Sequence, residues 1–184
     1  MKICLTGGIA CGKSLLSRFL NDLGVETLDA DDIVHELIPA EERRRLAATV
    51  FRDASARHAL ESRIHPLVKE RIRAFLDAPS DRLRLAVVPL LFEVHWDVDF
   101  DIIGCVKSSR ETQIERMMTT RGYSREEAES RLAAQMDVEE KAARSQYVIE
   151  NDGTAGQLKE QAKGFVSWLK NSMCSPRRPN RSVR

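Results

Sequence analysis

The segment Gly7-Gly8-Ile9-Ala10-Cys11-Gly12-Lys13-Ser14 fits the phosphate-binding loop pattern G-x-x-x-x-G-K-[ST]. The apolar residues Ile3 to Leu5 before it predict a short buried strand, and residues 14–23 have apolar side chains at helical spacing. In a loop between a strand and a helix, backbone N–H groups point inward at an anion, and the positive end of the helix dipole adds to them. The segment therefore predicts an α/β protein with a site for the phosphates of a nucleotide.

Two residues of this loop have the chemistry that a bound nucleotide requires. Lys13 is expected to reach the β- and γ-phosphates, and the hydroxyl of Ser14 is expected to ligate Mg²⁺, the predicted cofactor. A chance match to four fixed positions is the alternative, and the flanking strand and helix argue against it. The ATP-binding residues predicted from the loop are Gly8, Ile9, Ala10, Cys11, Gly12, Lys13, Ser14 and Leu15.

Composition indicates one compact domain. The 184 residues are 42% hydrophobic and 31% charged, which suffices for a sizeable core, and we expect a single domain over residues 1–173. The formal net charge of +1 does not indicate nucleic-acid binding, so no nucleic-acid partner is expected. Residues 174–184 are rich in serine, proline and arginine and predict a basic disordered tail.

The cysteines and the hydropathy pattern indicate a cytoplasmic protein. Cys4 and Cys105 lie in apolar runs, as buried reduced thiols do, and neither the four cysteines nor the four histidines have the spacing of a zinc site. The chain has no run of about eighteen apolar residues, and its start, MKICLTGG, lacks the extended apolar region of a signal peptide. We therefore expect no membrane association.

Acidic residues follow the second predicted strand, residues 25–28. Asp29, Asp31 and Asp32 come at its carboxyl end, which is where open parallel sheets bind their ligands. One of these acids is a candidate to accept a proton from a hydroxyl or to hold Mg²⁺ through water. In the alternative interpretation, Asp29 or Asp32 caps a helix that begins near Ile33. Three acids are more than one cap requires, so the functional role stays open for at least one of them.

Three further strands are predicted by apolar runs at residues 85–91, 100–106 and 147–149. Pro89 lies inside the first run and predicts that the regular strand ends before it. Residues 33–75 have a helical and heavily charged pattern. Within them, His65-Pro66 is expected to start a helix, because proline suits the first helical turn. Residues 157–169 predict a final amphipathic helix, with a disordered tail beyond Asn171.

Two helices joined by an arginine-bearing turn predict a lid. Residues 111–120 are amphipathic, Arg116 and Arg121 lie near the end of this helix, and Ser124 with Glu127 forms a capping box that opens the next helix. Such a lid closes over the phosphates, excludes water and places cations on the transferring phosphoryl group. The alternative is that these arginines only solubilise exposed helices.

The order and spacing of several short motifs resemble the dephospho-coenzyme A kinase family over almost the whole chain. These motifs are L-T-G-G-I-x-x-G-K-S at Leu5 to Ser14, D-A-D at Asp29 to Asp31, H-P at His65-Pro66, V-V-P-L-L-F-E at Val87 to Glu93, E-T-Q-x-x-R ending at Arg116, A-A-Q-M at Ala133 to Met136, and E-E-K-A-A-R-S-Q-Y-V-I-E-N-D-G at Glu139 to Gly153. The resemblance implies a three-layer P-loop NTPase fold with a five-stranded parallel sheet. It also implies a helical substrate-side region at about 33–77 and a small lid at about 115–140.

The resemblance implies an activity as well. It is the transfer of a phosphoryl group from ATP to the ribose 3′-hydroxyl of dephospho-coenzyme A, the last step of coenzyme A biosynthesis. By the same resemblance, Asp31 is the catalytic base, Arg116 stabilises transition-state charge beside Lys13, and Asn151 lies near the adenine of ATP. The implied substrate-binding residues are Asp29, Asp31, His65, Pro89, Leu90 and Glu93. We expect a monomer, with a weak oligomer as the alternative.

The sequence departs from the family's pattern at three places. The segment between Asp32 and His65 is shorter than usual and lacks an F-G followed by a D-G turn, which bears on substrate recognition. In the lid, Thr120-Arg121-Gly122 stands where R-D-G is usual, so Arg121 lies one position late. Cys11 occupies a loop position where serine is common, which leads to the hypothesis that oxidants inactivate the protein.

Two other classes share part of these features. A different small P-loop kinase, acting on a nucleoside, a nucleotide or shikimate, has the same loop, acids and lid arginines. A non-catalytic nucleotide-binding module is the second alternative, and loss of the loop lysine or of the candidate base favours such a module. Both residues are present in this sequence.

Overall fold

A five-stranded parallel sheet forms the centre of the protein. The computed structural model describes residues 1–39, 41 and 54–174. The strands are β1 (Ile3–Gly7), β2 (Glu26–Asp29), β3 (Arg84–Val87), β4 (Ile102–Lys107) and β5 (Tyr147–Glu150), in the spatial order β2-β3-β1-β4-β5. All pairings are parallel, with Leu5 beside Val87 on one side and beside Gly104 on the other. The predicted five-stranded parallel sheet is thereby confirmed, and β1 with its phosphate-binding loop lies at its centre.

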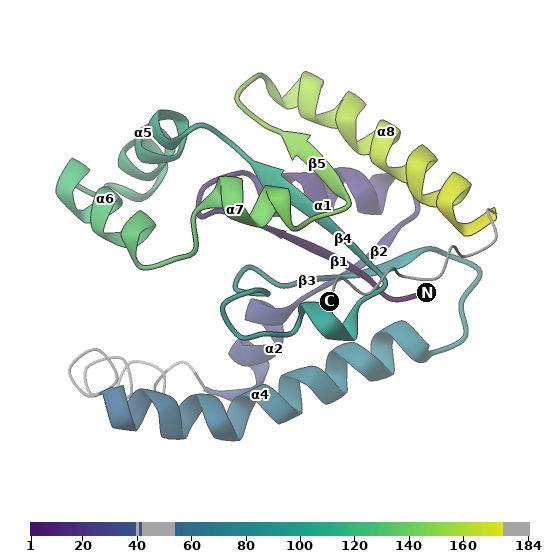
Figure 1. Cartoon of the computed structure of the whole chain (residues 1–184), viewed down its shortest axis with the longest axis horizontal. Helices are drawn as coiled ribbons and strands as arrows, with labels where there is room; N and C mark the ends of the chain where they lie inside the picture. The colour runs from purple at the N-terminus through teal and green to yellow at the C-terminus, as the bar shows by residue number, and fades with distance from the viewer. Residues whose placement is uncertain (40, 42–53, 175–184) are drawn as a thin grey trace, which may run out of the picture.

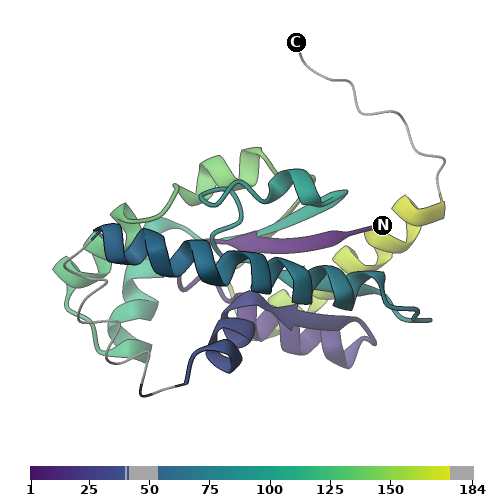
Figure 2. The ribbon, with the colours of Figure 1, turned by 90° about the horizontal axis from the view of Figure 1, so that it is seen from below.

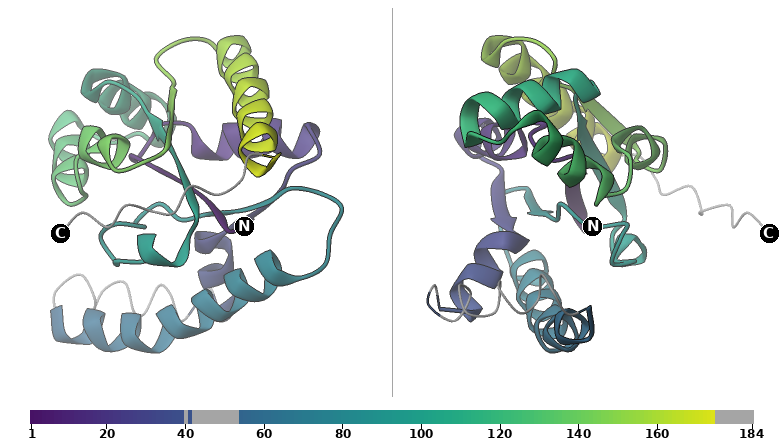
Figure 3. Two further views of the ribbon diagram at one scale, coloured as in Figure 1. Left: turned by 45° about the vertical axis from the view of Figure 1, so that its right-hand side comes forward. Right: turned by 90° about the vertical axis from the view of Figure 1, so that its left-hand side faces the viewer.

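Helices cover both faces of the sheet. They are α1 (Lys13–Asp22), α2 (Ala30–Leu37), α4 (Ala54–Asp77), α5 (Arg110–Arg121), α6 (Arg125–Ala133), α7 (Val138–Ala143) and α8 (Ala155–Cys174), with a 3₁₀ turn, η1, at Asp97–Asp99. Figure 1 and the two views of Figure 3 place α1 and α8 on one side of the sheet and α2 and α4 on the other. Figure 2 shows α4 running along one face of the sheet, with α2 beside this helix. The predicted three-layer architecture is confirmed.

Side-chain alternation along the strands produces two cores. Successive residues of a strand point to opposite faces, so Cys4 packs in the core under α2 and α4, whereas Ile3 and Leu5 pack in the core under α1 and α8. Every residue of β1 is buried, as expected for a strand with helices on both sides. No helix in the described part of the chain is long and apolar enough to span a membrane.

The helices α5 and α6 lie beyond the carboxyl ends of the strands and have a small core of their own (Figure 1). Gly122, with φ 68°, ends α5 in the left-handed region, and Ser124 forms the predicted capping box with Glu127 at the start of α6. The segment predicted as a lid is therefore a two-helix unit next to the phosphate-binding loop.

Three predictions of helix boundaries are wrong. The first helix of the 33–75 region begins at Ala30 rather than near Ile33, because Asp29 caps it. Pro66 lies inside α4 instead of starting a helix. It is exposed, as is Ser62 four residues before it, so water can hydrate the carbonyl that proline leaves without a donor. The last helix continues past Asn171 to Cys174, while residues 40, 42–53 and 175–184, which include parts of the substrate-side region and the tail, lie outside the described residues.

Candidate active site

A cleft of about 740 Å³ opens at the carboxyl ends of β1 and β2. It lies between the phosphate-binding loop with the start of α1, the end of β2, the turn after β3, the lid helix α5 and the loop between β5 and α8. Its lining residues are Ile9, Ala10, Gly12, Lys13, Ser14, Leu15, Arg18, Asp29, Asp31, Pro89, Arg116, Thr120, Arg121, Gln135, Asn151, Gly153 and Ala155. Most of the residues singled out in the sequence therefore meet at one edge of the sheet, as the topology of a parallel sheet favours.

The loop has a backbone that requires glycine at two positions. Gly7 has φ 145°, and a Cβ there would lie 2.1 Å from the carbonyl oxygen of Val106. Gly12 has φ 92°, and a Cβ there would lie 2.3 Å from Nδ2 of Asn151. At both positions a side chain would disfavour the backbone conformation and would clash with the neighbouring atom. The loop is thus packed directly against the ends of β4 and β5.

Lys13 folds back over the loop. Its Nζ donates hydrogen bonds to the carbonyl oxygens of Gly7 at 2.9 Å and Gly8 at 2.8 Å. Burial lowers the pKa of Lys13. The ammonium group is therefore held in the loop, at the position from which it can exchange these carbonyl oxygens for phosphate oxygens.

The two aspartates at the end of β2 have different surroundings. The carboxylate of Asp29 accepts a hydrogen bond from the backbone N–H of Asp31 at 2.9 Å and caps α2, and burial raises the pKa of Asp29. Asp31 lies in the first turn of α2 with its side chain exposed to the cleft. The helix-capping alternative is thus correct for Asp29, and Asp31 is the aspartate left available for chemistry.

Arg116 joins the phosphate-binding loop to the loop after β5. Its guanidinium donates to the carbonyl oxygens of Ala10 at 3.3 Å and Asn151 at 2.7 Å, and to the hydroxyl of Ser108 at 3.1 Å. The buried side chain of Asn151 donates from Nδ2 to the carbonyl oxygen of Cys11 at 2.8 Å. These four contacts tie the backbone of the loop to β5 and to the lid helix α5.

Several predicted site residues lie away from this cleft. His65 packs edge-on against Trp96, with ring centroids 5.2 Å apart, and Leu90 is 41% exposed. Glu93 forms an ion pair with Lys141. Gly8 borders a separate cavity of about 90 Å³ between the loop and α7. Of the predicted substrate-binding residues, Asp29, Asp31 and Pro89 line the cleft, while His65, Leu90 and Glu93 do not.

Cys11 is fully buried in the core under α1 and α8, so it can meet a phosphate only through its backbone. Burial raises the pKa of the Cys11 thiol, which keeps the thiol protonated at neutral pH, whereas the reactive form is the thiolate. We therefore expect, against the oxidation hypothesis, that iodoacetamide near neutral pH labels Cys11 only after the protein is unfolded. Peptide mass spectrometry measures this, and labelling of the folded protein at the rate of a free thiol would contradict the expectation.

Sequence reasoning missed six residues of this region. Five of them line the cleft, namely Arg18, Thr120, Gln135, Gly153 and Ala155, and the sixth, Lys141, is completely buried next to it. Lys141 had a signal in the sequence, because Lys141 and Ala142 stand three and four residues after Val138 and therefore share a helical face with this apolar residue. A charged residue on a buried face must have a partner.

The parallel sheet, the loop after β1 and the two-helix lid define a P-loop kinase. Residues 1–43 and 39–157 match the family model described as Dephospho-CoA kinase. The chain belongs to the dephospho-CoA kinase family.

Individual relatives agree with this assignment. A dephospho-CoA kinase of Geobacter sulfurreducens is 39% identical over an alignment that covers 91% of this chain and 97% of the relative. The crystal structure of TT1252 from Thermus thermophilus is 31% identical, has a TM-score of 0.78 and is matched over 92% of this chain and 97% of its own. A shikimate kinase from Bacteroides thetaiotaomicron, at 16% identity and a TM-score of 0.59 over 92% of this chain and 98% of its own, shares the fold.

Proposed function

We propose that this protein transfers the γ-phosphoryl group of ATP to the ribose 3′-hydroxyl of dephospho-coenzyme A, giving coenzyme A and ADP in the last step of coenzyme A biosynthesis. Membership of the family supports the reaction. The observation that carries its assignment to this site is that one cleft brings together Lys13, Asp31 and Arg116. These are the cation, the carboxylate and the second cation that in-line phosphoryl transfer requires.

Each of these residues has a distinct role in the proposed mechanism. The phosphates of ATP bind along the backbone N–H groups of the loop, and the Nζ of Lys13 leaves the carbonyl oxygens of Gly7 and Gly8 for the β- and γ-phosphates. Asp31 accepts the proton of the attacking 3′-hydroxyl. Arg116 has N–H groups beyond those that bind the backbone, and these stabilise charge on the transferring group. The lid helices exclude water when they close.

The residues at the cleft fit a magnesium ion that is held mainly by the nucleotide. No group of three or more metal-binding side chains occurs within the described residues. Mg²⁺ usually binds one or two protein oxygens together with substrate phosphates and water, and the exposed Ser14 hydroxyl with Asp29 and Asp31 across the cleft offers such a set. When bound, the ion would neutralise charge on the β- and γ-phosphates.

We further propose that the enzyme is a cytoplasmic monomer with one kinase domain over residues 1–173. Cys4, Cys11 and Cys105 are free thiols, which suits a reducing compartment. One domain is supported by the packing of Ile33, Val68 and Ile72 in a core shared with the sheet, and by the small size of the lid's own cluster.

The test is an assay with purified protein, ATP, Mg²⁺ and dephospho-coenzyme A, followed by mass spectrometry for one added phosphate on the ribose 3′-oxygen. Shikimate and common nucleosides serve as parallel acceptors. We expect a phosphorylated product only when dephospho-coenzyme A is the acceptor. Product with another acceptor would favour a different P-loop kinase activity, and ATP binding without any product would favour the non-catalytic module.

A further inference from the structure

Lys141 is a fully buried charge beside the cleft. Its side chain has no solvent exposure, and its Nζ lies 2.6 Å from Oε1 of Glu93 and 2.8 Å from the carbonyl oxygen of Pro89. Removing an ammonium group from water costs several kcal/mol, which only close partners offset. Apolar side chains of similar volume often serve stability as well as such a pair does. The presence of a lysine here therefore calls for a role besides stability.

The two partners of Lys141, Pro89 and Glu93, both lie in the turn after β3, and each of them contacts one further segment. Besides Lys141, the carbonyl oxygen of Pro89 accepts a hydrogen bond from the hydroxyl of Thr6 in β1 at 3.2 Å. Oε1 of Glu93 also accepts from the backbone N–H of Met136 at 3.1 Å, in the connection between α6 and α7. The ammonium thus lies where β1, the turn after β3 and the end of the lid come together.

The turn after β3, residues 89–95 (the Pro89 turn), forms part of the cleft wall. Pro89 lines the cleft together with Asp29 and Asp31, so its position shapes the wall next to the candidate base. The turn has no strand pairing of its own, since β3 ends at Val87. Its backbone is fixed at Pro89 by the hydroxyl of Thr6 and the ammonium of Lys141. Loss of the ammonium would leave one of these two contacts.

We propose that Lys141 is a positioning residue, which holds the Pro89 turn and, through Glu93, the end of the lid in the arrangement that binds the phosphoryl acceptor. This inference rests on the proposed function, because it assumes that the part of the cleft wall formed by Pro89 faces the phosphoryl acceptor. In the proposed mechanism, ATP binds along the loop, where Lys13 is hydrogen-bonded to Gly7 and Gly8 rather than to Pro89 or Glu93. The effect of Lys141 should therefore fall on the acceptor.

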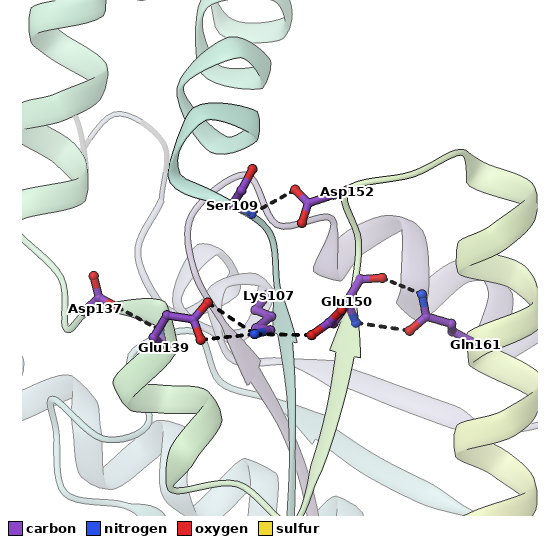
Figure 4. Close-up of polar contacts among 7 residues, drawn as sticks. All are labelled: Lys107, Ser109, Asp137, Glu139, Glu150, Asp152 and Gln161. Atoms are coloured by element: carbon purple, nitrogen blue, oxygen red, sulfur yellow. Dashed lines mark hydrogen bonds and ion pairs between the residues drawn. The ribbon is translucent and has the colours of Figure 1, made fainter.

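The matched control is Lys107 at the end of β4, a second lysine whose ion pair connects α7 to another segment. Its Nζ lies 3.1 Å from Oε2 of Glu139 in the first turn of α7 and 3.3 Å from Oε1 of Glu150 at the end of β5 (Figure 4). Both glutamates are largely exposed, and exposed pairs contribute little. Lys107→Met makes the same chemical change as Lys141→Met and removes contacts to the same helix, without touching the Pro89 turn.

The experiment measures kcat, both KM values and Tm for the two variants. We expect Lys141→Met to raise the KM for dephospho-coenzyme A by about tenfold or more, as displaced substrate-positioning groups do, with the KM for ATP close to that of the wild type. Lys107→Met should change neither KM. If Lys141→Met leaves the acceptor KM unchanged, or raises both KM values equally, the proposal is overturned.

A second variant separates positioning from folding. Lys141→Met alone leaves the carboxylate of Glu93, whose side chain is only 21% exposed, without its cation, which lowers stability. The double variant Lys141→Met with Glu93→Gln removes that charge, so its Tm should recover towards the wild-type value while the acceptor KM stays high. Recovery of both would mean that Lys141 acts through stability only. A wild type without product would refute the proposed function itself, which is a separate outcome.

Discussion

Asp31→Asn is expected to retain ATP binding and to lose phosphoryl transfer, with kcat reduced by about 10²–10⁴-fold, the usual contribution of a general base. Asparagine has nearly the shape of aspartate but cannot accept the proton of the acceptor hydroxyl. The side chain of Asp31 is exposed to the cleft and does not cap the helix, so the fold should not depend on it. Calorimetry with ATP and single-turnover kinetics with dephospho-coenzyme A measure the two effects separately.

The neighbouring aspartate supplies the control for this experiment. Asp32 is also exposed in the first turn of α2, but it does not line the cleft. Asp32→Asn should therefore have a kcat close to that of the wild type. Normal transfer by Asp31→Asn, or equal losses in both variants, would remove Asp31 from the role of base.

The sequence predicted those parts of the site that depend on local chemistry. The glycines and Lys13 of the loop follow a pattern whose spacing reflects the backbone path itself, and Gly7 and Gly12 have positive φ in a crowded environment, as such a path requires. Asp29 and Asp31 follow a strand, and parallel strands bring their carboxyl ends to one edge. For such residues, neighbours in the sequence already determine the place in the fold.

The parts that could not be predicted depend on contacts between distant segments. Nothing near Lys141 in the sequence indicates that its partners are Glu93 and the Pro89 carbonyl, about 50 residues away along the chain. The strand order β2-β3-β1-β4-β5 likewise results from packing of the whole sheet. The prediction that Pro66 starts a helix was wrong because it used only the local preference of proline for the first helical turn. Pro66 is instead tolerated inside α4, where its position is exposed.

Arg116 shows how a residue expected to face the substrate can have a second role. The resemblance assigns it to transition-state charge, whereas the structure also places its guanidinium on the backbone of Ala10 and Asn151. Both contacts are to carbonyl oxygens of segments that form the cleft. The same side chain therefore orders the nucleotide site and presents a cation to it, and its removal should affect both functions.

Arg116→Met is accordingly expected to lower kcat by about 10³-fold, in the range of an arginine that stabilises phosphoryl transfer, and also to raise the KM for ATP. Arg116→Lys keeps the charge but lacks the fork that reaches two carbonyls at once, so it should recover little of the loss. Thermal unfolding of both variants is measured in parallel, because part of the effect passes through the backbone contacts.

Arg121, the second arginine of the lid, is the control for the effect expected of Arg116→Met. It lines the same cleft from the last turn of α5, where its side chain is exposed. An exposed lid cation can approach a phosphate only when the lid closes, so Arg121→Met should lower kcat less than Arg116→Met does. If Arg121→Met has the larger effect while Arg116→Met mainly lowers Tm, then the transferring phosphoryl group is stabilised by Arg121, and Arg116 serves to hold the phosphate-binding loop against β5.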